Sequence, residues 1–521
     1  MEQFLQAETL VIELLLVVSI VAIAVRRLRI PYTVALVVVG LLITLQQPIE
    51  VNLTPELILA LFVPPLVFEA AFHLSLADLR RNMAGILIFT VPGVILTTLI
   101  VGLVVSYGVD ISLPLALVFG ALIAATDPIS VVALFRVLGA PKRLSVLVEG
   151  ESLFNDGTAI VVFNILLVFA LTGQFSLLQG VADFVRVAAG GTLIGLVLGW
   201  MVSRVIARVD DYLIETTLTT VLAFAAYLIA ERLHFSGVLA VVAAGLVNGN
   251  IGPQGMSPTT RIVIFNFWEY VAFLANSLVF LLIGLEVNLG ALVAAWHPVL
   301  WAILAVLVAR AVVIYGLGWV VNRFAEPIPR AWQHVLGWGG LRGAISLALV
   351  LSLPAAIGPG QEQLRVMAFG VVLFTLLVQS TTMGPFLRWL KISVRSDAQA
   401  EYEMRHARLV ALRAASKHLD HLHLEGLLSS HAHEKLKPGL DERISVVIKS
   451  VRDVLQSEPG LEAEELDTAQ REILRAQRSA FLGLRRDGVI SEETFEKLVA
   501  EIDAELLSET DGFAVPLEDN V

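Results

Sequence analysis

Residues 149–156 read Glu-Gly-Glu-Ser-Leu-Phe-Asn-Asp and lie inside an apolar stretch from about residue 144 to residue 171. Another acid, Asp127, lies inside the preceding apolar stretch, directly before Pro128. A carboxylate near the centre of a bilayer is so costly that acids in membrane segments usually mark ion or proton pathways. These residue types therefore indicate ion or proton transfer within a membrane.

One face of the helix expected over residues 144–171 carries oxygen donors. Ser152 and Asp156 are four residues apart and share a face, as do Glu151 and Asn155. Hydroxyl, amide and carboxylate oxygens suit a hard alkali cation. Irregular backbone near Thr126 can add carbonyl oxygens, since such backbone is tolerated at membrane depth where it lines a cavity.

Asp156 is the predicted site of exchange. A helix rises about 1.5 Å per residue. Asp156 therefore lies roughly 17 Å from the start of the run 144–171, and Asp127 roughly 21 Å from the start of the run 113–138. Both positions are near the centre of the bilayer. Desolvation disfavours a bare carboxylate charge, so the group is neutralised either by a proton or by a cation, but not by both. Asn155 is neutral and adds no second titratable charge. Glu151 needs a counter-ion, and we expect a structural pair with Arg342, because an unpaired buried charge costs about 3–5 kcal/mol.

Each of these residues also has a simpler interpretation. Asp127 can cap a helix that begins at the following proline. Asp156 can be a structural hydrogen-bond acceptor, and Arg342 can extend to the membrane surface. Glu69 can line an access funnel or simply lie at the interface. Two acids near the ends of apolar runs are assigned no role: Glu13 and Glu286.

The composition indicates a polytopic membrane protein. The 521 residues are 57% hydrophobic and 16% charged, which excludes a single water-soluble globule. About 20 apolar residues are needed to cross a hydrocarbon core of about 30 Å. Thirteen runs are predicted to cross: 8–26, 31–48, 54–73, 83–107, 113–138, 144–171, 177–209, 212–231, 236–250, 266–288, 292–322, 332–355 and 365–390.

Charge placement supports this count. With the N-terminus outside, 14 of the 19 basic residues before position 391 fall in cytoplasmic turns, as the positive-inside rule requires. The first run is followed by three arginines and has no cleavage pattern, so it is expected to stay as a membrane helix.

Two runs are interrupted by helix-breaking residues, at 125–128 (Ala-Thr-Asp-Pro) and at 337–343 (Gly-Trp-Gly-Gly-Leu-Arg-Gly). The interrupted runs are the fifth and the twelfth. If the seventh run connects two groups of six, each interrupted run is the fifth helix of its group. Corresponding broken helices in two inverted halves are the best sequence indication of a transport site. The alternative is that proline and glycine are simply common in membrane helices.

The tail has a different composition. Residues 391–521 hold 43 charged side chains against 40 in residues 1–390, and carry −9 of the net charge of −11. We expect a helical cytoplasmic tail, which can either regulate transport or strengthen a dimer, and no nucleic acid as partner. Its six histidines suit either a pH sensor or an ordinary solvated surface. The chain has no cysteine, no zinc-type spacing and no glycine-rich phosphate loop. We therefore expect neither an enzyme nor a cofactor, and no metal beyond the transported alkali cation.

Three segments resemble the signature segments of Na⁺/H⁺ antiporters of the NhaP/NHE type, in the monovalent cation/proton antiporter superfamily. They are residues 125–128 (Ala-Thr-Asp-Pro), 151–156 (Glu-Ser-Leu-Phe-Asn-Asp) and 340–345 (Gly-Leu-Arg-Gly-Ala-Ile). Residues 62–65 (Phe-Val-Pro-Pro) add to the similarity, which covers residues 8–390. The resemblance implies an ion site of Asp156 with Thr126, Asp127, Ser152 and Asn155, and a structural pair of Glu151 with Arg342.

The resemblance also implies an NhaA-like, all-α fold of two inverted six-helix repeats with crossed broken helices. The repeats would span 1–173 and 212–390, with 174–211 as the connecting helix and 391–521 as the tail. A homodimer, in which a mobile core domain moves against a scaffold domain by an elevator mechanism, is expected in a bacterial inner membrane. The Asn-Asp pair at 155–156 is typical of electroneutral members, which exchange one cation for one proton.

The predicted function is therefore exchange of Na⁺ or Li⁺ for H⁺, with a K⁺/H⁺ antiporter on the same scaffold as the alternative. A passive cation channel is disfavoured because no Thr-Val-Gly-Tyr-Gly filter segment occurs. A membrane sensor acting through its tail is a further alternative.

Overall fold

The computed structural model describes residues 2–28, 31–46, 59–174, 176–209, 211–254, 256, 258–358, 360–392 and 397–457, with scattered residues between 466 and 502. Throughout these ranges the regular elements are helices, and none is a strand. The chain forms two compact units, Met1–Val394 and Arg395–Val521.

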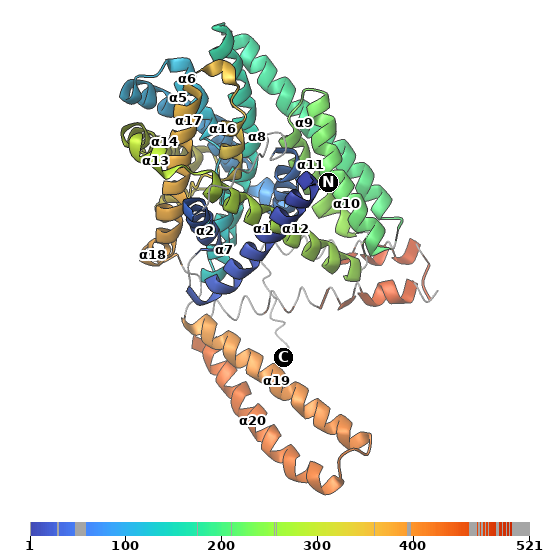
Figure 1. The fold of residues 1–521 in the computed structure, drawn as a ribbon. Coiled ribbons are helices and arrows are strands. Elements are labelled where there is room, and N and C mark those ends of the chain that lie inside the picture. The colour runs from blue at the N-terminus through green and yellow to red at the C-terminus, as the bar shows by residue number, and fades with distance from the viewer. Residues whose placement is uncertain are drawn as a thin grey trace. The chain divides into compact units, whose positions relative to one another are not determined.

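The first unit is a bundle of helices (Figure 1). In chain order, its α-helices are α1 (Glu2–Leu28), α2 (Tyr32–Gln46), α4 (Val63–His73), α5 (Leu76–Val109), α6 (Leu113–Leu122), α7 (Ile129–Leu138), α8 (Lys142–Thr172), α9 (Leu177–Ile206), α10 (Tyr212–Arg232), α11 (Gly237–Ile251), α12 (Pro258–Glu286), α13 (Leu289–Ala294), α14 (Trp296–Phe324), α15 (Arg330–Trp338), α16 (Ala344–Leu351), α17 (Gly360–Phe374) and α18 (Thr381–Trp389). A π-helical turn, η3 (Thr375–Ser380), joins the last two.

Local sequence sets the ends of these helices. Ser75, Asp211 and Ser236 each accept a hydrogen bond from a backbone N–H of the first turn of α5, α10 and α11 respectively. Gly139 and Gly173 end α7 and α8 in the left-handed conformation, at φ of 64° and 68°.

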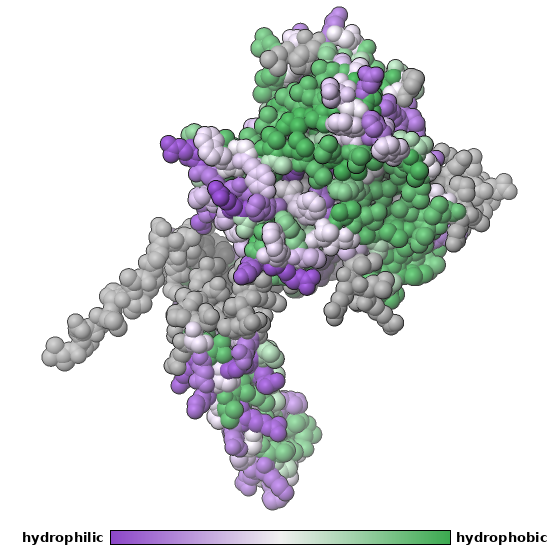
Figure 2. Space-filling view, turned by 90° about the vertical axis from the view of Figure 1, so that its left-hand side faces the viewer, coloured by the Kyte–Doolittle hydropathy of each residue, from purple (hydrophilic) through white to green (hydrophobic). Residues whose placement is uncertain are grey.

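The first unit is an integral membrane bundle. Seven of its described helices are long and apolar enough to cross a bilayer, and five shorter apolar helices accompany them. Figure 2 shows hydrophobic residues covering a broad continuous surface of the bundle, as lipid contact requires. The start of the third predicted run, residues 54–58, lies outside the described residues, and the count of thirteen crossings remains a prediction.

Two groups of helices can be distinguished by their packing. In one, α5 packs against α6, α8 and α14, and α17 packs against α14 and α16. In the other, α11 packs against α4, α9 and α10, while α12 packs against α2 and α4. Contacts of α8 with α4 and of α12 with α16 join the groups.

The close packing of α9 on α11 depends on glycine. Gly191, Gly195 and Gly199 recur every fourth residue of α9 and face α11. A Cβ atom at Gly195 would lie 2.8 Å from the Ala243 Cβ, and one at Gly199 would lie 3.0 Å from the Ala244 carbonyl oxygen. Small residues at this spacing let two membrane helices approach closely.

The interruptions predicted from the sequence are present. Residues 123–128 separate α6 from α7, and residues 339–343 separate α15 from α16. Both segments are buried or half-buried, so their backbone polar groups need partners inside the protein.

The second unit contains a helical hairpin of α19 (Asp397–Leu424) and α20 (Ser430–Ser457), which pack along each other (Figure 1). Asp420 accepts hydrogen bonds from Lys437 at 2.6 Å and from His433 at 2.9 Å. These two bonds hold the pKa of the Asp420 carboxyl below its usual value. The His423 ring stacks on His433, with 4.6 Å between the ring centroids.

We expect Gly195→Ala to destabilise the bundle by about 1–3 kcal/mol, because the new methyl group overlaps α11. Gly316→Ala in α14 is the matched control, since a Cβ atom there meets nothing within 4 Å. That change should leave the melting temperature unchanged or raise it, as alanine is the better helix former by about 1 kcal/mol. Thermal unfolding of the two purified variants in detergent measures the difference. Equal melting temperatures would contradict the close packing of α9 on α11.

Candidate ion-binding site

The two interrupted helices meet through their backbones. The Asp127 N–H donates to the Leu341 carbonyl oxygen at 2.8 Å, which joins the break before α7 to the break before α16. Gly343 lies directly against Asp127, because a Cβ atom built there would be 2.8 Å from the Asp127 Cγ. Only a residue without a side chain fits this crossing, which explains one glycine of the Gly-Leu-Arg-Gly segment.

Arg342 satisfies carbonyl groups that the first break leaves free. Its Nη1 donates to Ala124 O at 2.8 Å and to Ala125 O at 3.1 Å. Ser346, in the first turn of α16, donates to Ala125 O at 3.4 Å. Arg342 is only 1% exposed, so it is a buried link between the two breaks and not a residue that extends to the membrane surface.

Helix α8 holds the first break from the other side. Ser152 Oγ donates to the Thr126 carbonyl oxygen in a short hydrogen bond. Asn155 Nδ2 donates to Ala124 O at 3.1 Å and to the Thr126 Oγ1 at 3.3 Å. The carbonyl oxygens expected to be free for a cation already accept hydrogen bonds here. Ala124 O and Ala125 O each accept two hydrogen bonds, whereas Thr126 O accepts one and keeps its second lone pair for another partner.

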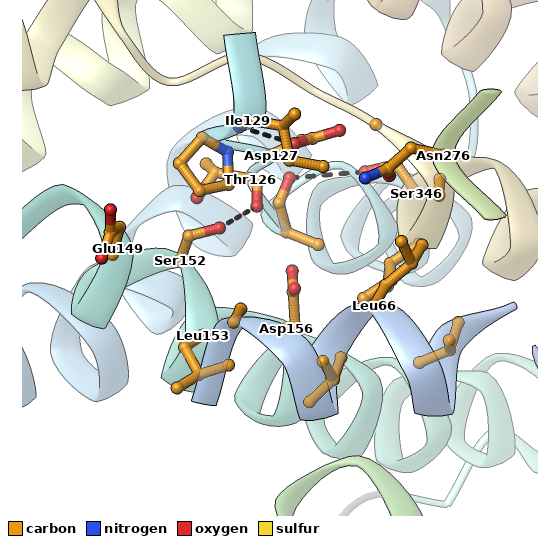
Figure 3. Close-up of a pocket in the computed structure, with 18 of the residues that line it drawn as sticks. Leu66, Thr126, Asp127, Ile129, Glu149, Ser152, Leu153, Asp156, Asn276 and Ser346 are labelled. Atoms are coloured by element: carbon orange, nitrogen blue, oxygen red, sulfur yellow. Dashed lines mark hydrogen bonds between the residues drawn. The ribbon is translucent and has the colours of Figure 1, made fainter. Parts of the chain in front are cut away.

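A polar cavity of about 110 Å³ lies beside this crossing (Figure 3). Asp127 and Asp156 both line it and both are half-buried. In Figure 3 the Asp156 side chain points toward Thr126 and Asp127. Within the described part of the chain, the Asp156 carboxylate takes part in no hydrogen bond or ion pair. The other polar residues around the cavity are Glu69, Thr126, Glu149, Ser152, Asn276 and Ser346.

The lining of the cavity comes from both helix groups. Glu149, Ser152 and Asp156 follow one stripe of α8, at helical spacings of three and four residues. Glu69 of α4 and Asn276 of α12 line the cavity from the other group. The site therefore lies between the two helix groups.

The predicted pair of Glu151 with Arg342 is wrong. Glu151 pairs with Arg310 of α14, whose Nη1 makes a short contact and whose Nη2 donates at 3.0 Å. Arg310 also donates to the Leu336 carbonyl oxygen at the end of α15, at 2.8 and 3.1 Å. Arg342 instead uses its Nη1 on the backbone of the first break. The register of α14 decides between the two arginines, and the sequence alone does not give that register.

Arg310 is the residue that the sequence analysis missed. The available signal was an arginine within the apolar run 292–322. Asn276 and Ser346 were missed as well, and neither stands out from the polar residues of its run. Among the described residues, no group of three or more His, Cys, Asp or Glu side chains is arranged to hold a metal ion.

The simpler interpretation of Asp127 also holds in part. Its Oδ1 accepts a hydrogen bond from the Ile129 N–H at 3.0 Å, so it caps the start of α7 while it lines the cavity. Asn155 does not line the cavity; its amide Nδ2 holds the break from behind, and its buried Oδ1 has no hydrogen-bond partner among the described residues.

Residues 14–389 match the family model described as the transmembrane part of sodium/hydrogen exchangers. The chain belongs to the sodium/hydrogen exchanger family. The resemblance noted from the three sequence segments is thereby confirmed, and the family is one of transporters, not enzymes.

Relatives within the exchanger family are similar over most of the chain. The Na⁺/H⁺ antiporter ApNhaP of Aphanothece halophytica is 38% identical over 92% of this chain and 88% of its own length. The low-affinity Na⁺/H⁺ antiporter NhaS1 of Synechocystis is 42% identical over 75% of this chain and 76% of its own.

A solved structure shares the fold. The sodium proton antiporter MjNhaP1 of Methanocaldococcus jannaschii aligns with a TM-score of 0.63 and 21% identity, over 75% of this chain and 99% of that one. Three quarters of this chain thus share the fold of that protein.

We expect Arg310→Met to destabilise the membrane unit by about 3–5 kcal/mol, because it leaves the Glu151 carboxylate buried without its partner. Adding Glu151→Gln to that variant should restore most of the loss. Arg323→Met on the same helix is the control, because Arg323 is exposed. Thermal melting of the purified variants is the measurement. An Arg310→Met protein as stable as the control would disprove the pair.

Proposed function

We propose that this protein is a secondary antiporter that exchanges Na⁺, or Li⁺, for H⁺ across a membrane, with Asp156 as the exchanging group. The single observation that supports this most is the half-buried Asp156 carboxylate, which faces a polar cavity and has no hydrogen bond or ion pair from the described residues. The names of the relatives, all Na⁺/H⁺ antiporters, support the same function.

Competition at one carboxylate couples the two ions. A partly desolvated carboxylate is stable when it is neutralised by a proton or by a cation, and it does not hold both. In the proposal, Asp127 and Ser152 complete the cation site from the cavity wall, together with Thr126. Asn155 contributes through the geometry of the break, because its amide binds Ala124 O and Thr126 Oγ1.

The exchange is proposed to be electroneutral, with one cation for one proton. Asn155 stands beside Asp156 and brings no second titratable charge to the pair. The charge of Glu151 is neutralised by Arg310, so Glu151 neither takes up nor releases an ion in the proposed exchange. The potassium alternative gains no support, because the relatives compared are named for sodium.

The proposed architecture has thirteen membrane-spanning segments in two inverted six-helix repeats, residues 1–173 and 212–390, joined by residues 174–211. The N-terminus lies outside and the tail from residue 391 lies in the cytoplasm of a bacterial cell. The helix group around α5 and α8 is the mobile core, and the group around α11 and α12 is the scaffold of a homodimer. Movement of the core against the scaffold carries the cavity between the two membrane faces.

We expect Asp156→Asn to abolish Na⁺-dependent collapse of an imposed proton gradient in everted vesicles, because the amide cannot exchange a proton for a cation. Asp183→Asn is the matched control, since Asp183 lies on the exposed side of α9 and pairs with Arg186. Fluorescence dequenching of a pH-sensitive amine dye reports the collapse. Full activity of Asp156→Asn would overturn the assignment.

Electroneutral exchange predicts that the membrane potential does not change the rate. In proteoliposomes, the initial rate of Na⁺-driven proton movement should be the same with a K⁺/valinomycin potential of either sign or of zero. A rate that follows the sign of the potential would show that net charge moves in each cycle, and would require a second titrating group such as Asp127.

A further inference from the structure

Three cavities follow one another along α12. The polar cavity of Asp156 shares Ala344 with a second cavity of about 30 Å³. That second cavity shares Glu286 with a third one of about 290 Å³, which lies at the end of α2 and the start of α13. The order of residues in α12 gives the direction: Asn276 lines the first cavity, Val279 the second and Glu286 the second and third.

The two ends of this line lie on opposite sides of Asp156. Glu69, at the first cavity, interacts electrostatically with Glu269 of α12. Glu269 is seven residues before Asn276, and Glu286 is ten residues after it, which is roughly 10 Å in one direction and 15 Å in the other. Glu149, which interacts with Glu69, belongs to the same end as Glu269.

The middle cavity is an apolar barrier. Apart from Glu286, every residue around it is hydrophobic: Val279, Leu282, Ile283, Ala344, Leu347, Ala348, Leu351 and Phe369. Ala348 is fully buried, and Val279, Ile283 and Leu347 are each 4% exposed. A hydrophobic constriction of this kind stops the passage of ions because water and cations leave it. It lies between α12 and α16, which belong to different helix groups.

We infer that the seam between α12 and α16 is the route by which a cation reaches Asp156 from the membrane face opposite Glu149, and that Glu286 gathers cations at its mouth. This inference rests on the proposed function. Glu286 is exposed at the end of α12, and Arg365 of α17 is the charged group that interacts with it. A negative charge at the mouth of a route raises the local cation concentration there. In this inference, Glu286 sets the apparent affinity for the cation in one half of the cycle.

The first test compares the two membrane faces. Glu286→Gln should raise the apparent KM for Na⁺ about three- to tenfold when Na⁺ is added at the face opposite Glu149, and leave it within about twofold at the other face. The rate at saturating Na⁺ should be retained on both faces. Right-side-out and everted vesicles from the same cells give the two measurements.

Two variants accompany this test. Glu362→Gln removes an acid close to Arg365 that lines none of the three cavities, and should leave both KM values unchanged. Glu149→Gln should raise the KM only at the face where Glu286→Gln has no effect. Equal effects of Glu286→Gln on both faces, or no effect on either, would overturn the role of Glu286.

The second test follows the route itself. The chain has no cysteine, so Ala348→Cys supplies the only thiol of the protein. A membrane-impermeant methanethiosulfonate added from the Glu286 face should label it when the Na⁺ and H⁺ gradients favour opening to that face, and the label should then block Na⁺/H⁺ exchange. Absence of labelling from that face under every gradient would exclude the seam as a route.

The two tests separate this inference from the proposed function. Without Na⁺/H⁺ exchange by the unmodified chain on either face, the proposed function fails. The labelling of Ala348→Cys then still decides whether the seam opens. With exchange present and the KM values of Glu286→Gln equal to those of the unmodified protein, the proposed function stands and the role of Glu286 is rejected.

Discussion

The arrangement of this protein depends on the pairing of backbone groups that have left their helices inside a membrane. Residues 123–128 and 339–343 are buried or half-buried, so the polar groups of each break that do not face the cavity find their partners in the other break or in neighbouring side chains. Arg342, Ser152 and Asn155 donate to the first break, and the Asp127 N–H donates to the second. The side chains of Arg342, Ser152 and Asn155 thus hold the irregular backbone in place.

The same pairing distinguishes Asp156 from Asp127 and Glu151. One carboxylate oxygen of Asp127 accepts a hydrogen bond from the Ile129 N–H, and Glu151 is bound by Arg310. Asp156 faces the cavity with no such partner among the described residues. A carboxylate without such partners is costly to keep charged at this depth, which supports the proposal that a proton or an alkali cation neutralises it.

Much of the fold follows from the sequence, because a membrane helix must be apolar over a known length and a break must carry glycine or proline. The interruptions at 125–128 and 337–343 could be located in this way, and so could two of the acids that line the cavity, Asp127 and Asp156. The sequence alone could not predict which arginine pairs with Glu151. Both Arg310 and Arg342 lie within apolar runs, and the choice between them depends on how far α14 is shifted along α8. Likewise, that Asn155 points to the break and not to the cavity depends on the helix rotation that packing imposes.

Arg310 contacts the side chain of Glu151 on α8 and the last carbonyl groups of α15, so it joins the uninterrupted helix of the site to one of the interrupted ones. Together with Arg342, it ties all ligand-bearing segments of this helix group to one another. In the proposed exchange, a group connected in this way would move without changing its own internal distances. Its preference for a metal ion over a proton would then be the same at both membrane faces, and the two concentration gradients alone would set the direction of net flux.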